Sequence, residues 1–357
     1  MLILAGVTIQ TLTGDNGLLQ KAESAKQANE VASAQEKIQV EVAGSYGLDG
    51  KIDIEQLNTN LKRINGLKYN DKDIVLEGDD KNIIEELPAE VFLDGNNFFI
   101  DENGKVLDWK KADLINEKIG NIVQGYNAQN LEWQVYYSDP VETFLISKKE
   151  AKTSYPIPLT RKKQNENEEE YVYKGSEYLR KSVYGAKWNK IWLNKCKEDT
   201  ANNGESTRLN AQATAYMCDP VNWSEYAIDG ISNYAVGGPT VELFIKSWNK
   251  SQKANIKIQD SDITTVGYKY DGVDGFFQEG VITKDIKNGV YGANKWMAVW
   301  LSSPCDGWTW GNKCIFYVSS DGILTCIYWD REWCIRPIVS IPTSKISVTG
   351  DTVTVNP

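Results

Sequence analysis

The chain has 357 residues, enough for two or three domains, and its 41% hydrophobic and 25% charged residues are typical of a folded protein rather than a disordered or polytopic membrane protein. It contains no histidine, which excludes Ser-His-Asp and Cys-His nucleophile systems and His-ligated zinc. The net charge of −10 disfavours nucleic acid as a partner.

The acidic charge is concentrated in the first third of the chain. Residues 1–110 carry 20 acidic and 11 basic side chains, a net charge of −9, whereas the remainder is close to neutral at −1. This asymmetry predicts at least two units with different surfaces. We expect an α+β protein with domains at 1–44, 45–110 and 111–342, and a terminal segment at 343–357.

The chain begins with an apolar run over residues 1–9. As a helix it would measure about 13 Å, too short to cross a hydrocarbon core of about 30 Å. We expect it to be the remnant of a longer apolar segment. From Leu18 to about Ala43 the spacing predicts an amphipathic helix that Gly44 ends. The apolar positions on its face are Leu18, Ala22, Ala25, Ala32, Ile38 and Val42.

Taken alone, such a helix is also typical of a helical bundle. Residues 4–9 and 13–19, followed by the Ala- and Lys-rich helix, resemble the N-terminal region of type IV pilin-like proteins of Gram-positive bacteria. In that family an apolar half-helix anchors the subunit in the membrane and later in the filament core. The chain lacks the prepilin-peptidase site and about half of the apolar helix. The resemblance implies an extracellular protein of the cell surface or pilus, with other pilin subunits as partners.

Residues 50–109 read as a small α+β unit. A short helix is expected at 54–61, and apolar residues 91–93 and 98–100 flank a turn at Asp94-Gly95 that predicts a hairpin. The run 99–106 is also similar to the hairpin that follows the helix in the pilin-like proteins.

Residues 133–138 and 141–147 alternate as a hairpin with its turn at Asp139-Pro140. Helices are predicted at 206–217 and after Gly238, with Pro239 in the first helical position. Residues 346–355 read as a hairpin or an extended tail. No metal or cofactor is predicted.

Cysteine first occurs at Cys196, and Cys305, Cys314, Cys326 and Cys334 lie close together. No CxxC pair exists, which disfavours a zinc ribbon or a thioredoxin-type site. The cysteines can form disulfides or remain buried thiols, and the sequence leaves both open.

The strongest signal is the segment 296–337, which holds six of the twelve tryptophans and four of the six cysteines. Clustered Trp and Tyr with interspersed Asp, Arg and Asn is typical of binding hot spots. A tryptophan-rich core is the alternative. The predicted ligand contacts are Asp306, Trp308, Trp310, Asn312, Tyr328, Trp329, Asp330, Glu332 and Trp333.

Residues 300–304 and 335–341 frame this segment. They resemble the frame of C-type-lectin-like domains of the formylglycine-generating-enzyme fold, used by variable proteins of diversity-generating retroelements. The resemblance covers roughly residues 112–342 and departs from the family at Cys334, where glycine is usual. It implies structural roles for Trp300, Arg336 and Pro337. It also implies that the first strand, 133–138, pairs with the last, 335–340.

Together the two resemblances imply a non-enzymatic receptor or adhesin that binds a protein or glycan on another cell or phage, through a segment that retroelement mutagenesis diversifies. Two alternatives remain. One is a thiol/metal oxidase that uses Cys314 and Cys326, and the other is a phage tail receptor-binding protein, which would share the lectin-like domain but not the pilin-like helix.

Overall fold

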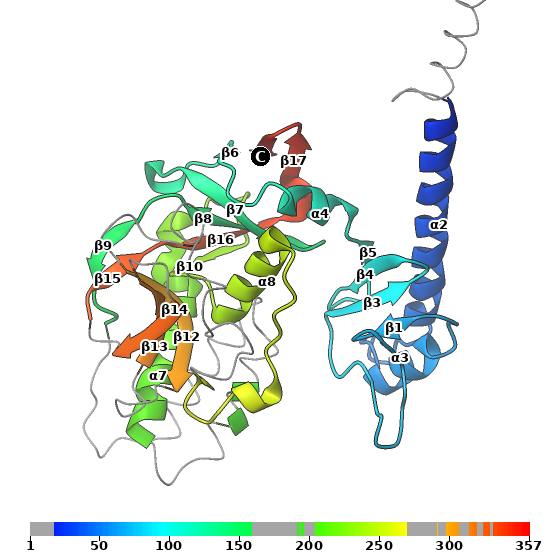
Figure 1. Ribbon diagram of the computed structural model, residues 1–357, viewed down its shortest axis with the longest axis horizontal. Coiled ribbons are helices and arrows are strands. Elements are labelled where there is room, and N and C mark those ends of the chain that lie inside the picture. The colour runs from blue at the N-terminus through cyan, green and yellow to red at the C-terminus, as the bar shows by residue number, and fades with distance from the viewer. Residues whose placement is uncertain are drawn as a thin grey trace, which may run out of the picture. The chain divides into compact units, whose positions relative to one another are not determined.

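The computed structural model describes residues 18–158, 191, 192, 194, 195, 204–269, 291, 298–306, 314–319, 324–328 and 331–357. The protein is α+β and divides into two compact units, Met1–Lys111 (unit 1) and Ala112–Pro357 (unit 2) (Figure 1). The N-terminal helix and the small unit after it therefore share one body. Each unit is described separately below.

Unit 1 combines two helices with a five-stranded antiparallel sheet of order β2-β1-β3-β4-β5. The predicted short helix and the predicted hairpin, which is formed by β3 and β4, are both present. Its elements are α2 (Leu18–Ala43), α3 (Ile54–Leu61), β1 (Lys68–Tyr69), β2 (Lys72–Asp73), β3 (Ala89–Leu93), β4 (Asn96–Ile100) and β5 (Val106–Asp108), and α4 (Lys110–Asn116) runs across the boundary.

Helix α2 packs through its C-terminal half. Ala34, Ile38 and Val42 are fully buried at four-residue steps, whereas residues 20–30 are exposed and the helix extends past the sheet of unit 1 (Figure 1). Ala32, predicted on the buried face, is exposed, because the contact stripe runs through positions 34, 38 and 42. Gln39 fixes the register, since its side chain bonds the backbone N–H of Val106 at 2.9 Å.

Unit 2 contains two larger sheets, of order β10-β16-β8-β7 and β14-β13-β12-β15-β9, with β11 paired to β12. Helix α7 packs against β12 and β13, and α8 against β7 and β12 (Figure 1). The strands are β6 (Val123–Gln124), β7 (Trp133–Ser138), β8 (Glu142–Ser147), β9 (Lys152–Tyr155), β10 (Tyr234–Val236), β11 (Tyr268–Lys269), β12 (Val299–Asp306), β13 (Cys314–Val318), β14 (Leu324–Tyr328), β15 (Trp333–Ile335), β16 (Ile338–Pro342), β17 (Ile346–Thr349) and β18 (Thr352–Val355). The helices are α7 (Gly204–Cys218) and α8 (Val241–Gln252), with 3-10 turns η1 (Ala128–Asn130), η2 (Pro220–Tyr226), η3 (Asp260–Asp262) and η5 (Thr343–Lys345).

The expected pairing of the first strand with the last is wrong. Strand β7 pairs with β8, and β8 lies between β7 and β16. The other edge of β7 is bonded by Gly120 and Asn121, which exchange backbone hydrogen bonds with Val135 at 2.9 and 3.0 Å. On the near edge, the carboxylate of Asp139 accepts the backbone N–H groups of Val141 and Glu142 at 2.8 Å and forms a tight turn. This turn folds β8 back onto β7, and all six residues of β8 are buried, as a central strand requires.

Helix α8 begins later than predicted. Thr240 is its N-cap, with a side-chain oxygen that accepts the backbone N–H of Leu243 at 3.1 Å, so the first helical residue is Val241 and not Pro239. The threonine hydroxyl supplies the cap that the Gly-Gly-Pro pattern did not reveal.

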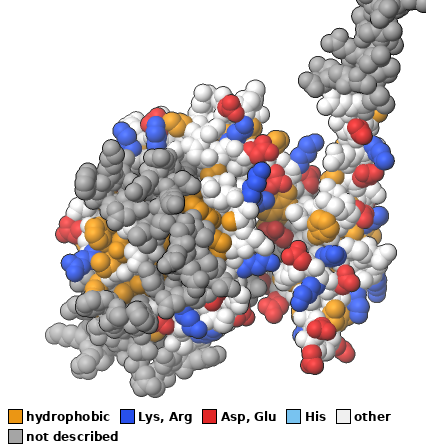
Figure 2. Space-filling model, viewed as in Figure 1, with side chains coloured by type: hydrophobic (Ala, Val, Ile, Leu, Met, Phe, Trp, Pro, Cys, Tyr) orange, Lys and Arg blue, Asp and Glu red, His pale blue; other side chains and the backbone are white. Residues whose placement is uncertain are grey.

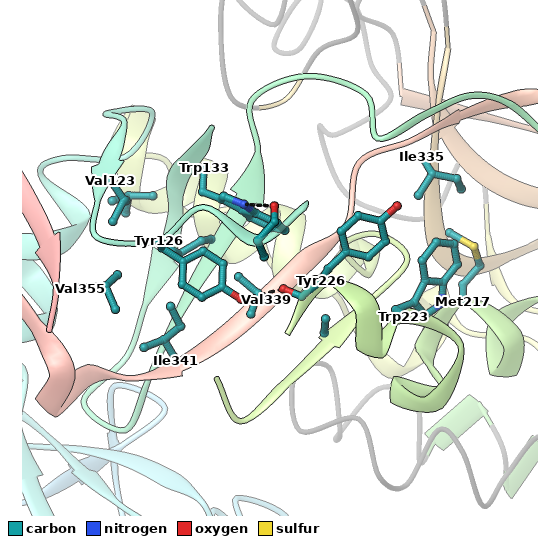
Figure 3. Packing of buried hydrophobic residues seen from close by; sticks show 14 of the residues in the cluster. Val123, Tyr126, Trp133, Met217, Trp223, Tyr226, Ile335, Val339, Ile341 and Val355 are labelled. Carbon is teal, nitrogen blue, oxygen red and sulfur yellow. Dashed lines mark hydrogen bonds between the residues drawn. The ribbon is translucent and has the colours of Figure 1, made fainter. Parts of the chain in front are cut away.

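A large aromatic core joins the β7–β8–β16 sheet to the rest of unit 2 (Figure 3). The rings of Tyr126 and Trp133 meet edge to face at 5.4 Å, and the Tyr126 hydroxyl donates to the carbonyl of Tyr226 at 2.7 Å. Strands β17 and β18 form a hairpin that adds to this core through Val353 and Val355. The last residues thus belong to unit 2.

Candidate functional site

The structure describes four of the nine predicted ligand contacts. Asp306 and Tyr328 are half-buried at the ends of β12 and β14, Glu332 is exposed, and Trp333 is half-buried at the start of β15. The other five lie outside the described residues: Trp308, Trp310, Asn312, Trp329 and Asp330.

These four residues do not form one patch. Tyr328 lies opposite Cys314 in the β13–β14 ladder and therefore shares its face of the sheet. Trp333 stacks on Tyr317, which points to the opposite face because side chains alternate along β13. The predicted contacts Tyr328 and Trp333 are thus on different faces of the sheet.

Around Trp333 the structure assembles a set of aromatic side chains that we call the aromatic face. It consists of Tyr155, Tyr216, Trp223, Tyr317 and Trp333. The rings of Tyr317 and Trp333 are stacked, with centroids 5.6 Å apart and planes at 14°. Tyr155 and Tyr216 form a second stacked pair at 6.4 Å, and their hydroxyls are hydrogen-bonded.

Strand pairing positions the aromatic face. Tyr155 of β9 lies opposite Trp333 of β15, in a strand pairing that no local sequence pattern predicts. Beneath them Trp300 is fully buried, with its indole N–H donating to the carbonyl of Tyr155 at 3.2 Å and its ring edge to face with Tyr317 at 6.2 Å. Trp300 therefore supports both stacked pairs from below.

Exposure separates the face into a buried base and an accessible part. Trp223 is fully buried, whereas Tyr155, Tyr216, Tyr317 and Trp333 keep part of their surface exposed. Burial and the hydrogen bond to Tyr155 raise the pKa of Tyr216, so its hydroxyl stays protonated at neutral pH. The two tyrosines can therefore both donate and accept hydrogen bonds.

Charged side chains surround the aromatic face. The ammonium of Lys152 lies 4.8 Å from the ring centre of Tyr155 and 5.4 Å from that of Trp223, and it pairs with Glu225 at 3.5 Å. Glu332 accepts a hydrogen bond from the Ser154 hydroxyl. Figure 2 shows hydrophobic side chains gathered over β9 and β15, with acidic and basic groups beside them.

Of this arrangement, only Trp333 and Glu332 were predicted as ligand contacts. Tyr317 lies inside the tryptophan-rich segment but was not predicted, and Tyr155, Tyr216 and Trp223 come from β9, α7 and η2, far from β15 in sequence. The only local signal was the Asp219-Pro220 pair, which starts η2 and so places Trp223 beside Tyr216.

The three residues assigned structural roles are buried. The guanidinium of Arg336 donates to the carbonyl of Ser147 at 2.8 Å, and burial lowers its pKa to about 10, which keeps it charged at neutral pH. The carbonyl of Pro337 accepts the N–H of Ser147 at 3.1 Å. The thiol of the buried Cys334 donates to the carbonyl of Thr153 at 3.3 Å.

Among the described residues, no group of three or more acidic or cysteine side chains has the geometry to hold a metal ion. None of the helices in the described ranges is both long and apolar enough to span a membrane.

Comparison with known proteins gave no match. No family model matches the chain, and no curated protein or solved structure is significantly similar to it.

Proposed function

We propose that this protein is a non-enzymatic ligand-binding protein and that the aromatic face is its binding surface. The observation that carries the proposal is the pair of half-buried ring stacks, Tyr317 on Trp333 and Tyr155 on Tyr216, beside the charged groups of Lys152 and Glu332.

Aromatic rings held by a rigid sheet fit this role. They offer large contact area at low entropic cost, and a ring of polar groups around an apolar centre is the usual anatomy of an interface. A purely structural role accounts for Trp300 and Trp223, which are fully buried. It accounts less well for Tyr155, Tyr317 and Trp333, which remain partly exposed. The ligand is a protein or a glycan, since surfaces that bind either class present aromatic rings bordered by charged groups.

We further propose that the protein is displayed at the cell surface and that α2 is a pilin-like helix. Support comes from the N-terminal half of α2, where residues 20–30 are exposed on the surface of unit 1, as a helix that contacts other subunits requires. We propose a C-type-lectin-like fold for unit 2, of the kind found in variable proteins of diversity-generating retroelements, on the sequence frame 300–304 and 335–341. A phage tail receptor-binding protein would share that fold but would not need α2.

The oxidase alternative finds less support. It requires a reactive thiolate pair, and the thiols of Cys314 and Cys326 are in contact. Their hydrogen bonding and burial raise both pKa values, which favours the unreactive protonated thiol.

The test is direct binding of the purified, fluorescently labelled protein to a glycan microarray and to an array of bacterial surface proteins. We expect saturable binding to at least one probe. The double variant Tyr317→Ala, Trp333→Ala should weaken that binding by about 30-fold or more, because removing hot-spot aromatics costs about 2 kcal/mol or more.

Two further variants separate binding from folding. Val141→Ser alters a 39% exposed apolar residue in the β7–β8 turn and should leave binding unchanged. Glu332→Lys reverses an exposed charge beside the aromatic face and should change affinity without changing the melting temperature. Absence of any wild-type signal, or equal loss in Val141→Ser, would refute the proposal.

A further inference from the structure

Three cysteines converge on one face of the sheet formed by β12, β13 and β14. Cys305 of β12 lies directly opposite Cys314 of β13 in the antiparallel ladder. Cys326 of β14 lies opposite Phe316, two positions along β13 from Cys314, and so shares the same face.

The three thiols are linked to one another by contacts through Cys326. The thiol of Cys326 is hydrogen-bonded to those of both Cys314 and Cys305. Cys305 is fully buried, Cys314 is 3% exposed, and all three pack in the core that contains Tyr268 and Phe316. Cys218 and Cys334 instead donate to the carbonyls of Ser302 and Thr153.

We propose that Cys305 and Cys314 form a disulfide when the protein is oxidised, and that Cys326 remains a thiol beside it. The pairing of β12 with β13 favours this pair of cysteines over the others. Directly opposed residues in antiparallel strands have Cα atoms about 4.5 to 5.5 Å apart, inside the range of about 4.4 to 6.8 Å that a disulfide needs. The register of the ladder therefore places this pair within bonding range.

Cys326 is less well placed for bonding. It is diagonal to Cys314, where Cα atoms are about 7 to 8 Å apart, and it is two strands away and two residues along from Cys305, about 12 Å for an ideal sheet. A bond from Cys326 to either partner would therefore require backbone movement, although its sulfur contacts both.

The oxidant is a small-molecule disulfide, and the reaction is two successive exchanges. One thiolate, Cys305 or Cys314, attacks the reagent, forms a mixed disulfide and releases one small thiol. The other thiolate then attacks the mixed disulfide, forms the intrachain S–S bond and releases the second small thiol. The protein loses two electrons and two protons, and the reagent gains them.

Burial determines when this reaction happens. Both sulfurs are inaccessible in the folded protein, and contact with Cys326 and burial raise the pKa of Cys314, so little thiolate forms at neutral pH. We expect oxidation to be fast during refolding and slow once the protein is folded. The disulfide closes a ring from Cys305 to Cys314, the segment that carries the predicted contacts Trp308 and Trp310.

Peptide mapping tests the pairing. The full chain is refolded with reduced and oxidised glutathione, free thiols are alkylated, and the protein is digested with trypsin and endoprotease Asp-N. Cleavage after Lys295 and Lys313 and before Asp306, Asp321 and Asp330 places the three cysteines in separate peptides. We expect a linked pair that contains Cys305 and Cys314, with Cys326 alkylated.

Variants make the result decisive. Cys326→Ser should still form the bond, whereas Cys314→Ser should form no bond among the remaining two. Oxidation should raise the melting temperature of the wild type by roughly 5 to 10 °C, and of the double variant Cys305→Ser, Cys314→Ser by none. A bond from Cys326, a bond from Cys305 or Cys314 to any other cysteine, or three free thiols after oxidative refolding would overturn the proposal.

Discussion

Glu142 is a buried carboxyl whose charge should set the pH dependence of folding in unit 2. It is 6% exposed at the start of β8, and it accepts hydrogen bonds from Ser340 at 2.8 Å and Asn233 at 2.9 Å. Burial raises its pKa from 4.5 to about 7, assisted by the nearby carboxylate of Asp139. The hydrogen bond from Ser340 opposes this shift but is too weak to cancel it.

The sign of the pH dependence of the free energy of unfolding follows from the protons that the folded and unfolded chains bind. Between pH 4.5 and about 7 the folded carboxyl holds a proton that the unfolded chain has released, so the free energy of unfolding falls as the pH rises. The shift of about 2.5 pKa units, at 1.36 kcal/mol each, corresponds to about 3 kcal/mol of lost stability above pH 7.

Glu142→Gln should remove this dependence. The amide oxygen can still accept from Ser340 and Asn233, and the side chain no longer ionises. We expect the variant to match the wild type within about 1 kcal/mol at pH 4.5 and to exceed it by about 3 kcal/mol at pH 8. Urea unfolding followed by tryptophan fluorescence reports on unit 2, because eleven of the twelve tryptophans lie there.

The comparison of the two proteins removes the titration of Glu142 together with its coupling to the nearby carboxyl of Asp139. Asp139, whose pKa burial also raises, is present in both proteins. A stability difference that stays constant from pH 4.5 to 8, or one that favours the wild type at pH 8, would refute the reasoning.

Two further substitutions probe the framework of each unit. Gly104→Ala should destabilise unit 1 by about 1 to 3 kcal/mol, since Gly104 has φ +74° and an added Cβ would lie 2.8 Å from the Tyr46 hydroxyl. Gly50→Ala is the matched control, because Gly50 has a similar φ of +76° but an added Cβ there would meet no atom within 4 Å. Thermal unfolding followed by circular dichroism measures both variants. Arg336→Met should destabilise unit 2 by about 1 to 3 kcal/mol in urea unfolding, because it removes the buried charged donor to the Ser147 carbonyl; unchanged or increased stability would contradict a structural role.

Local patterns predicted the elements that are defined by neighbouring residues. The helix at 206–217 and the hairpins around Asp94 and Asp139 are present, because periodicity and turn chemistry act over a few residues. Patterns did not predict which strand lies beside which. The position of β8 between β7 and β16 depends on burial of its whole length, which the composition of β8 does not reveal.

The candidate site was predictable to the same limited extent. The density of tryptophan near Trp333 indicated a special surface, but the Tyr155 and Tyr216 rings reach it only through the pairing of β9 with β15 and the packing of α7. The assumption that Tyr328 and Trp333 share a surface failed, because strand alternation places them on opposite faces. Predicting which side chains share a face of the sheet requires knowing which strands pair and in which register.

The parallel pairing of β18 with β6 also bears on how unit 2 is handled as a separable module. Val353 lies beside Val123, so the last strand of the unit is tied to its first. A fragment that stops at residue 342, the end of β16, would lose β17 and β18 and uncover the edge of β6 and part of the aromatic core. A recombinant form of unit 2 should therefore begin no later than Lys110, so that α4 stays whole, and should run through Val355.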